Sequence, residues 1–267
     1  MNRKRIAMIV TTVLRTEEKL TVEALEIAEY LQLPFVKRRK KSVNMLKKEY
    51  GTDVLVIGKN RYELFMHAQS EPFFFHPNSA VFRIKRIQKN EHDPFIEATN
   101  LQNGSSFLDC TFGLGSDSIV ASFVVGEEGK VEGCEASHML SFLVKKGLKT
   151  WETDCEATNL AMERIHIYHT DALAELKNRR ENSIDCVYFD PMFEEEISSS
   201  AGIAPLRNLA VYQDLTEEMI KEALRVAKKR VVLKDHFRSK RFEKFGFSVI
   251  KRKSATFHYG ILLKEQI

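Results

Sequence analysis

Three residues that suit one kind of chemistry follow an apolar stretch late in the chain, in the segment Tyr188-Phe189-Asp190-Pro191-Met192-Phe193. The exocyclic nitrogen of a nucleobase is a poor nucleophile, because its lone pair is delocalised into the ring. A carboxylate and a nearby backbone carbonyl can accept its N–H bonds and aim the lone pair at a methyl group, while an aromatic side chain stacks on the base. We therefore predict Asp190, Pro191 and Phe193 as catalytic residues for methyl transfer to an amino group. The alternative is a strand that ends at the proline, with Phe193 in the core.

A glycine-containing turn, Phe107-Leu108-Asp109-Cys110-Thr111-Phe112-Gly113-Leu114-Gly115-Ser116-Asp117, joins a strand candidate to a helix candidate. Glycine lets the backbone approach a ligand, and a helix N-terminus offers unpaired N–H groups, so the turn suits a ligand that carries a carboxylate. By itself the motif is weak, and a plain tight turn also explains it. The dinucleotide fingerprint needs a third glycine where Ser118 stands, which disfavours NAD. Asp109, four residues before Gly113, favours S-adenosylmethionine (SAM).

Further acidic residues follow successive strand candidates. Glu135 comes after one strand, and its two oxygens can accept both hydroxyls of a ribose. Asp171 comes after the next strand and can accept a hydrogen bond from an adenine amino group, while Asp190 ends the strand after that. One acid after a strand is usually a solvated turn or a helix cap. Three of them in register with a glycine turn indicate a ligand site at the carboxyl ends of the strands.

The elements that must position these residues alternate along the chain from Phe107 onward. Such alternation predicts an α/β fold, a mostly parallel sheet with helices on both faces. Two further strands at the end predict an antiparallel C-terminal hairpin that closes a seven-stranded sheet. The strand candidates are 106–110, 129–134, 165–169, 184–190, 230–234, 247–251 and 256–263, and the helix candidates lie near 117–125, 137–149, 155–164, 171–180 and 214–228.

Residues 1–100 predict a small N-terminal α/β domain that precedes the larger domain of residues 101–267. The polar stretch of residues 100–106 marks the boundary. The charged and then apolar start faintly resembles a signal peptide, but threonines interrupt the apolar run and no cleavage site follows, so a first strand is the better interpretation. The elements expected here are a strand over 6–13, a helix over 21–31 capped by Thr21, a helix from Ser42 to Gly51, and a hairpin formed by 54–57 and 62–66.

Composition excludes several classes of protein. With 267 residues, 43% hydrophobic and 29% charged, the chain has the make-up of an ordinary globular protein. It contains no run of 18 apolar residues, so we expect no transmembrane helix and no membrane partner. Its four cysteines form no CxxC and have no histidine at metal-ligand spacing, which predicts buried thiols, no metal and a cytoplasmic location. The sequence gives no indication of the oligomeric state.

The net charge of +4 hides an uneven distribution of charge. Residues 1–100 carry 18 basic and 12 acidic groups, residues 101–200 carry 8 and 18, and residues 201–267 carry 15 and 7. Any one basic cluster is usually a solvated face. Because all the clusters flank the acidic middle, we expect phosphate contacts on either side of a ligand pocket and RNA as the partner. The clusters are Lys37–Lys41, Lys47-Lys48, Arg83–Lys89, Lys228–Arg230, Arg238–Lys244 and Lys251–Lys253.

Together, these motifs resemble those of class I SAM-dependent methyltransferases, and within that class those of the RsmJ family, which methylates the guanine N2 amine of small-subunit ribosomal RNA. The resemblance is specific between about residues 107 and 234 and reaches weakly into the N-terminal part. It implies a Rossmann-like methyltransferase fold, SAM as the cofactor, and a part in ribosomal RNA processing. The matching segments are Gly113–Asp117, Asp190–Phe193 and Lys229–Lys234.

Carried over by position, the resemblance implies a set of SAM contacts. With the residues derived above, the predicted cofactor-binding residues are Asp109, Gly113, Gly115, Ser116, Asp117, Glu135, Ala136, Asp171, Ala172 and Asp190. The chain departs from the family at Lys89–Pro94, in place of a glycine-rich stretch, and at Glu194–Glu196, in place of proline and basic residues. Both departures concern the target nucleotide more than the cofactor. Two alternatives therefore stay open: a methyltransferase for a small molecule or protein, and a non-catalytic RNA-binding protein with this fold.

Overall fold

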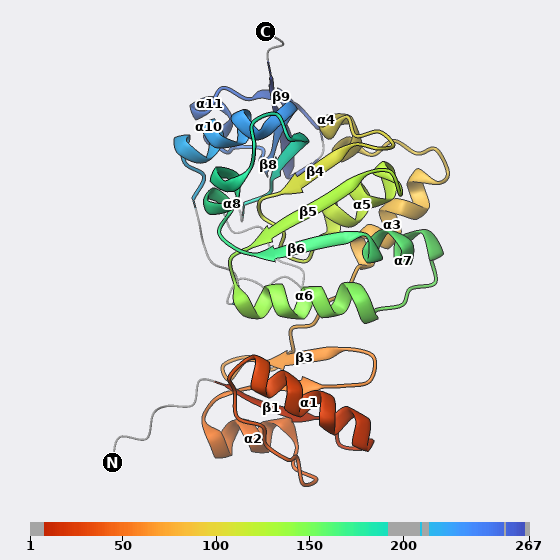
Figure 1. Cartoon of the computed structure of the whole chain (residues 1–267), viewed down its shortest axis with the longest axis vertical. Coiled ribbons are helices and arrows are strands. Elements are labelled where there is room, and N and C mark those ends of the chain that lie inside the picture. Colours follow the sequence, from red (N-terminus) through yellow and green to blue (C-terminus); the bar gives the residue numbers. More distant parts are fainter. Residues whose placement is uncertain (1–7, 192–208, 210–213, 254, 265–267) are drawn as a thin grey trace. The chain divides into compact units, whose positions relative to one another are not determined.

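The computed structural model describes residues 8–191, 209, 214–253 and 255–264. Contacts divide the described chain into two compact units, one that ends at His76 and one that begins at Pro77 (Figure 1). Each unit has its own sheet: three strands in the first and seven in the second.

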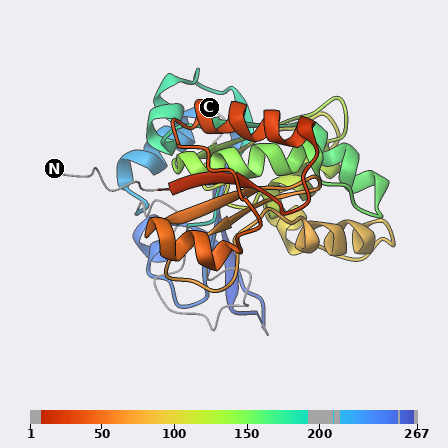
Figure 2. The ribbon, with the colours of Figure 1, turned by 90° about the horizontal axis from the view of Figure 1, so that it is seen from below.

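The first unit is built on the strand order β1-β2-β3, in which β1 and β2 are parallel and β2 and β3 are antiparallel. Side chains alternate between the two faces of a strand. Ile9, Val54 and Val56 therefore pack with Leu46 of α2 on one face. Figure 2 shows that α1 (red) and α2 (orange) lie on opposite sides of β1. The elements are β1 (Met8–Thr12), α1 (Glu18–Tyr30), α2 (Val43–Tyr50), β2 (Asp53–Ile57) and β3 (Tyr62–Phe65).

The helix ends in this unit test two predictions. Ser42 caps α2, as predicted, by accepting a hydrogen bond from the backbone N–H of Met45 at 3.1 Å, and Gly51 ends the helix in the left-handed conformation. The prediction that Thr21 caps the first helix is wrong. That helix begins at Glu18, and its N-cap position is Glu17. The helix extends by almost a turn because Glu18 and Lys19 are good helix formers.

The second unit contains the predicted sheet, in the order β6-β5-β4-β7-β8-β10-β9. The pairs from β6 to β8 are parallel, and β10 pairs antiparallel with both β8 and β9. The chain winds outward from β4 in one direction and from β7 in the other, so the switch point lies between these neighbouring strands, where such sheets bind ligands. The strands are β4 (Ser106–Asp109), β5 (Lys130–Glu135), β6 (Ile165–His169), β7 (Ile184–Phe189), β8 (Ala227–His236), β9 (Ser248–Ile250) and β10 (Phe257–Leu263).

Helices cover both faces of this sheet. On one face, Leu176 of α8 and Ala223 of α10 pack with strand residues such as Val187 in one apolar core. On the other face, Phe95 of α4 lies edge-on to Phe107 of β4 and Tyr188 of β7. The helices are α3 (Asn78–Ile87), α4 (Pro94–Thr99), α5 (Ser116–Val125), α6 (His138–Thr150), α7 (Glu156–Glu163), α8 (Ala172–Asn178), α10 (Glu217–Val226) and α11 (Arg241–Lys244).

The division between the units falls earlier than the polar stretch of residues 100–106 suggested. Helices α3 and α4 belong to the second unit. Arg83 of α3 forms an ion pair with Asp117 of α5, and Phe95 of α4 is part of the aromatic core under the sheet. The polar stretch is thus a loop between α4 and β4 within one compact unit.

Within the described residues, no helix is both long and apolar enough to span a membrane. The four cysteines are buried free thiols, as predicted. No cluster of three or more histidine, cysteine or acidic residues in this part of the chain has an arrangement that could bind a metal ion.

Candidate active site

The two motifs that the sequence singled out meet at the switch point of the second sheet. The backbone N–H of Cys110 donates to the carbonyl of Tyr188 at 2.9 Å, which joins the ends of β4 and β7. Thr111, the residue after Cys110, makes a second link: its hydroxyl accepts from the backbone N–H of Asp190 at 2.6 Å. The glycine turn and the predicted catalytic segment are therefore directly bonded to one another.

The glycine turn depends on backbone conformations that favour glycine. Gly113 and Gly115 have φ angles of +54° and +70°, and Gly115 is the N-cap residue of α5. Phe112 fixes the turn on β5, where Gly133 leaves room for its ring: a Cβ at Gly133 would lie 1.9 Å from Phe112 Cδ2. Ser116 follows as the first residue of α5, so the unpaired N–H groups of this helix begin directly after the turn.

Asp109, at the end of β4, holds the glycine turn in place through hydrogen bonds. Its side chain is buried and accepts hydrogen bonds from the backbone N–H of Thr111 at 2.9 Å and from the Ser118 hydroxyl at 2.7 Å. Burial raises the pKa of Asp109 to about 7, although both hydrogen bonds favour the charged form. Ser118 stands where a dinucleotide fingerprint would have glycine, and here it anchors this carboxylate.

Glu135 lies at the same edge, at the end of β5. One of its oxygens accepts from the backbone N–H of Gly113 at 3.2 Å, and the other from that of Ser137 at 2.8 Å. Burial raises the pKa of this carboxyl group, against those two hydrogen bonds. Because each carboxylate oxygen has two lone pairs, both oxygens keep the capacity to accept a further donor.

The predicted residues after β6 come to this edge as well. Asp171 is the N-cap of α8 and accepts from the backbone N–H of Ala174 at 3.0 Å, so the helix-cap interpretation holds for one of its oxygens. Ala172 is buried in the first turn of that helix. The carbonyl of Ala136 lies 3.2 Å from His169 Nε2, and the backbone N–H of Thr170 donates to the carbonyl of Glu135 at 3.2 Å.

A series of ion pairs with alternating charge lies next to the predicted catalytic segment. Lys234 of β8 places its Nζ 2.7 Å from Asp190 Oδ2 and 2.9 Å from Asp117 Oδ2. Asp117 also accepts from Tyr188 Oη at 2.7 Å and from Arg83 Nη1 at 2.5 Å, and Arg83 pairs in turn with Asp93. Both oxygens of Asp117 therefore accept hydrogen bonds from groups of the protein itself.

Asp190 differs from Asp117 in having one oxygen without a partner among the described residues. Its side chain is 28% exposed, and among the described residues only Oδ2 is bonded, to Lys234. Burial and the neighbouring charge of Asp117 raise the pKa of Asp190 to about 6, while Lys234 opposes the rise. For Asp117, the charges of Lys234 and Arg83 outweigh burial and hold its pKa well below the ordinary value. The arrangement presents one anchored carboxylate with an oxygen directed away from its anchor.

The remaining predicted catalytic residues are only partly described. Pro191 is buried directly after Asp190. Phe193 lies outside the described residues, as do the acidic residues 194–196.

Sequence reasoning did not identify Thr111, Tyr188, Lys234 and Arg83 as parts of this site. Lys234 carried a usable signal, because a lysine at the end of the apolar run Val231-Val232-Leu233 needs a buried partner. Arg83 carried none: it stands in a basic run, and its partner Asp117 is 34 residues away.

Several basic residues that we expected to face phosphates are bound within the second unit instead. Besides Arg83, Lys85 pairs with Asp154 and Arg86 with Glu91. Arg230 donates to the carbonyl of Ala98 and Arg241 pairs with Asp214 and Asp235, so these two are also bound internally. Exposed basic residues of the C-terminal clusters include Lys228, Arg238, Lys240, Lys244, Lys251 and Lys253.

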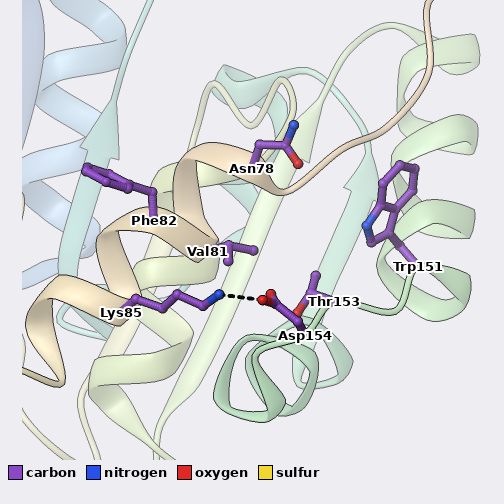
Figure 3. Close-up of a pocket in the computed structure, with 7 residues that line it drawn as sticks. All are labelled: Asn78, Val81, Phe82, Lys85, Trp151, Thr153 and Asp154. Carbon is purple, nitrogen blue, oxygen red and sulfur yellow. Dashed lines mark hydrogen bonds and ion pairs between the residues drawn. The ribbon is translucent and has the colours of Figure 1, made fainter.

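A surface hollow of about 390 Å³ lies elsewhere on the second unit (Figure 3). In Figure 3, Lys85 extends toward Asp154 across part of this hollow, and Phe82 points away from that ion pair. None of its lining residues is a predicted site residue, and the switch point of the sheet, where the acids gather, locates the site better than this hollow does. The hollow is lined by Asn78, Val81, Phe82, Lys85, Trp151, Thr153 and Asp154.

The strand order, the glycine turn and the strand-end acids define the class of SAM-dependent methyltransferases. The chain belongs to the family described as "Putative SAM-dependent methyltransferase", whose model matches residues 35–258. It is a SAM-dependent methyltransferase, and SAM is its cofactor. A crystal structure of the SAM-dependent methyltransferase NGO1261 from Neisseria gonorrhoeae has the same fold, with a TM-score of 0.61 and 17% identity over 96% of each chain.

Two relatives differ in what their names say. The uncharacterized protein YpiP of Bacillus subtilis (strain 168) is 49% identical to this chain over 254 residues, which cover 95% of this chain and 98% of that protein. The ribosomal RNA small subunit methyltransferase J of Shewanella piezotolerans is 31% identical over 169 residues, which cover 59% of this chain and 60% of that enzyme. The chain thus spans less than two thirds of the named ribosomal RNA methyltransferase.

Proposed function

We propose that this methyltransferase acts on RNA and methylates the guanine N2 amine of small-subunit ribosomal RNA. The observation that carries the proposal is Asp190 at the switch point of the sheet: Lys234 bonds one of its oxygens, and no described residue bonds the other. An amine nucleophile needs an acceptor of this kind. The 31% identity to ribosomal RNA small subunit methyltransferase J supports the choice of RNA as the substrate.

The residues present fit SAM in their chemistry. The backbone N–H groups of the first turn of α5, from Ser116, would hold the methionine carboxylate, since Gly113 and Gly115 keep the approach clear. Glu135 would accept both ribose hydroxyls, and Asp171 with Ala172 would contact the adenine. Asp117 would act indirectly, because it is buried and already bonded to Arg83, Tyr188 and Lys234; it fixes α5 and Lys234 relative to one another. Asp109 and Ala136 would shape the walls of the pocket.

The cofactor supplies an electrophilic methyl group on a positively charged sulfur. The task of the chain is therefore to position the amine and to remove water. Asp190 Oδ1 would accept a hydrogen bond from one N–H of the amine and direct the nitrogen lone pair toward the methyl group. Once the nitrogen carries the methyl group, the same carboxylate would take up the proton that the nitrogen releases. Lys234 favours the ionised form of Asp190, and Thr111 fixes its backbone. Phe193, if it stacks on the base, would hold the ring in plane.

A test of the substrate uses small ribosomal subunits, or their RNA, purified from cells that lack the protein. The full chain, SAM with a labelled methyl group and this RNA are incubated, and the RNA is digested to nucleosides for mass spectrometry. We expect label in N2-methylguanosine. Label in another nucleoside would keep the enzyme class and exclude the proposed atom. If neither the small subunits nor their purified RNA become labelled, the result would favour a small molecule or a protein as the substrate. The internal pairing of Arg83, Lys85 and Arg86 makes this alternative worth testing, because these residues are already bound to acids of the protein.

The first unit would contribute to RNA binding in this proposal. Its exposed basic residues include Lys37, Arg39, Lys40 and Lys48. A chain cut after His76 and one that begins at Pro77 would separate this contribution from the binding of SAM.

A further inference from the structure

An aromatic and basic surface lies at the end of the second sheet where Asp190 is found. We call it the Phe237 patch. It is formed by the end of β8 and the start of β10, which are neighbours: Phe257 is paired with His236, and the backbone N–H of Phe237 donates to the carbonyl of Thr256 at 3.1 Å. The patch consists of Phe237, Arg238, Arg252, Phe257 and His258, together with the buried His236, whose ring lies against that of Phe237.

Lys234 connects this patch to the predicted catalytic carboxylate. Its Nζ lies 2.7 Å from Asp190 Oδ2 and 5.0 Å from the centroid of the Phe257 ring. Phe237 follows Lys234 by three residues, which is about 10 Å of extended chain. The Phe237 patch therefore begins beside Asp190 and extends outward from it.

The rings of the patch are close together and flanked by guanidinium groups. The Phe237 ring centroid lies 4.6 Å from that of His236 and 6.1 Å from that of His258, yet the residue is 44% exposed. Arg238 lies 5.0 Å from the Phe237 centroid, and Arg252 lies 4.5 Å from that of Phe257. A large apolar side chain that stays this exposed beside cations suits a partner with flat rings and negative charge.

The residues around the Phe237 patch carry more positive than negative charge. Asp235 is buried and accepts from Arg241 at 3.0 Å and from Ser239 at 2.6 Å. Arg241 also pairs with Asp214, so these three charged groups leave one negative charge. Glu243 of α11 is exposed nearby in the sequence, against a larger set of exposed basic residues. That set comprises Arg238, Lys240, Lys244, Lys251 and Lys253.

We infer that the Phe237 patch binds unpaired nucleotides next to the one that is methylated: Phe237 stacks on a neighbouring base, and Arg238 and Arg252 contact the flanking phosphates. The inference rests on the proposed RNA substrate and adds the conformation that this RNA would have when it is bound. In a duplex, base faces are covered by their neighbours, whereas unpaired bases can splay out and stack on aromatic side chains. The enzyme would accordingly select single-stranded or flipped-out RNA rather than helices.

The test measures binding of the full chain to two labelled RNA probes, a 12-nucleotide single strand and a duplex of the same sequence. Phe237→Ala should weaken binding of the single strand by on the order of tenfold, the effect of losing one base–aromatic stack. It should leave duplex binding and SAM binding unchanged. Phe237→Tyr keeps the ring and should bind as the wild type does. Arg238→Gln should lower the slope of log affinity against log salt by about one.

A matched control is Phe82→Ala. Phe82 resembles Phe237 in being 64% exposed and in having an arginine, Arg86, 5.7 Å from its ring centroid. It lies outside the Phe237 patch and lines the hollow of Figure 3. This variant should bind both probes as the wild type does. The inference is overturned if folded Phe237→Ala binds the single strand normally, if it loses single strand and duplex equally, or if the control loses as much. If the wild type binds neither probe, the proposed RNA substrate itself is wrong.

Discussion

Replacement of Lys234 by methionine would test how this protein keeps the half-buried carboxylate of Asp190 ionised. Lys234 Nζ lies 2.7 Å from Asp190 and 2.9 Å from Asp117, and its side chain is 17% exposed. Methionine has a similar length and no charge. The variant leaves Asp117 paired with Arg83 and removes the only described cation that bonds Asp190.

The size of the effect follows from the geometry. An opposite charge within about 4–6 Å lowers the pKa of a carboxyl group by roughly 1 to 3. Without Lys234, burial and Asp117 raise the pKa of Asp190 unopposed, so it should lie above the value of about 6 that it has beside Lys234. Tyr188, Tyr259, Asp109 and Asp235 also face this group, and none of them supplies a positive charge. If ionised Asp190 accepts the amine N–H bond, kcat/KM at pH 7 should fall roughly 2- to 100-fold and recover at higher pH.

The assay is the pH dependence of kcat/KM for methyl transfer to RNA. The acid limb should lie near pH 6 in the wild type and move upward in Lys234→Met, while Lys234→Arg keeps it in place. Lys229→Met is the matched control on the same strand: its Nζ lies 3.0 Å from Asp185, and its side chain is 56% exposed. Because breaking a buried ion pair costs about 3–5 kcal/mol, circular dichroism must show that the variant is folded. An acid limb that stays near pH 6 in folded Lys234→Met would refute the reasoning.

Two further predictions concern the glycine turn. Gly133→Ala places a Cβ 1.9 Å from Phe112 Cδ2, so it should lower the free energy of unfolding by about 1–3 kcal/mol. Because Phe112 fixes the glycine turn, the variant should also bind SAM more weakly. Calorimetry that finds the wild-type affinity for SAM would contradict this role of Phe112. Asp109→Asn should stabilise the fold at pH 8 by up to about 4 kcal/mol, because the folded-state pKa of about 7 makes ionisation more costly in the folded than in the unfolded chain. That advantage should shrink as the pH falls from about 7 to about 4, because the folded-state carboxyl group is protonated over this range while the unfolded-state one is still ionised; below about pH 4 both are protonated. Urea unfolding at pH 8 and pH 5 measures the difference, and an advantage independent of pH would count against it.

The fold was largely predictable because apolar runs and turn residues are local signals. Ser42 and Gly51 marked the ends of α2, and the alternation after Phe107 predicted the sheet. The hairpin at the end was predicted too, but its pairing was not: β10 lies between β8 and β9, and only long-range pairing determines that order.

The site was predictable for residues at strand ends and not for those that hold them. Glu135 and Asp190 stand at positions that the parallel sheet brings together. Arg83 looked like one more member of a basic run, and only the packing of α3 against α5 makes it a partner of the buried Asp117. Charge composition alone does not distinguish a lysine or arginine that faces RNA from one that neutralises a buried acid.

The most direct test of the account is methyl transfer by Asp190→Ala, with labelled SAM and the RNA that the wild type modifies. The variant removes the acceptor that orients the amine and leaves the glycine turn and Glu135 in place. We expect calorimetry to find SAM bound as in the wild type and the rate of methyl transfer to fall at least about 100-fold, the scale of a lost positioning contact. Full activity of a folded Asp190→Ala would contradict the central claim that this carboxylate directs the amine at the methyl group.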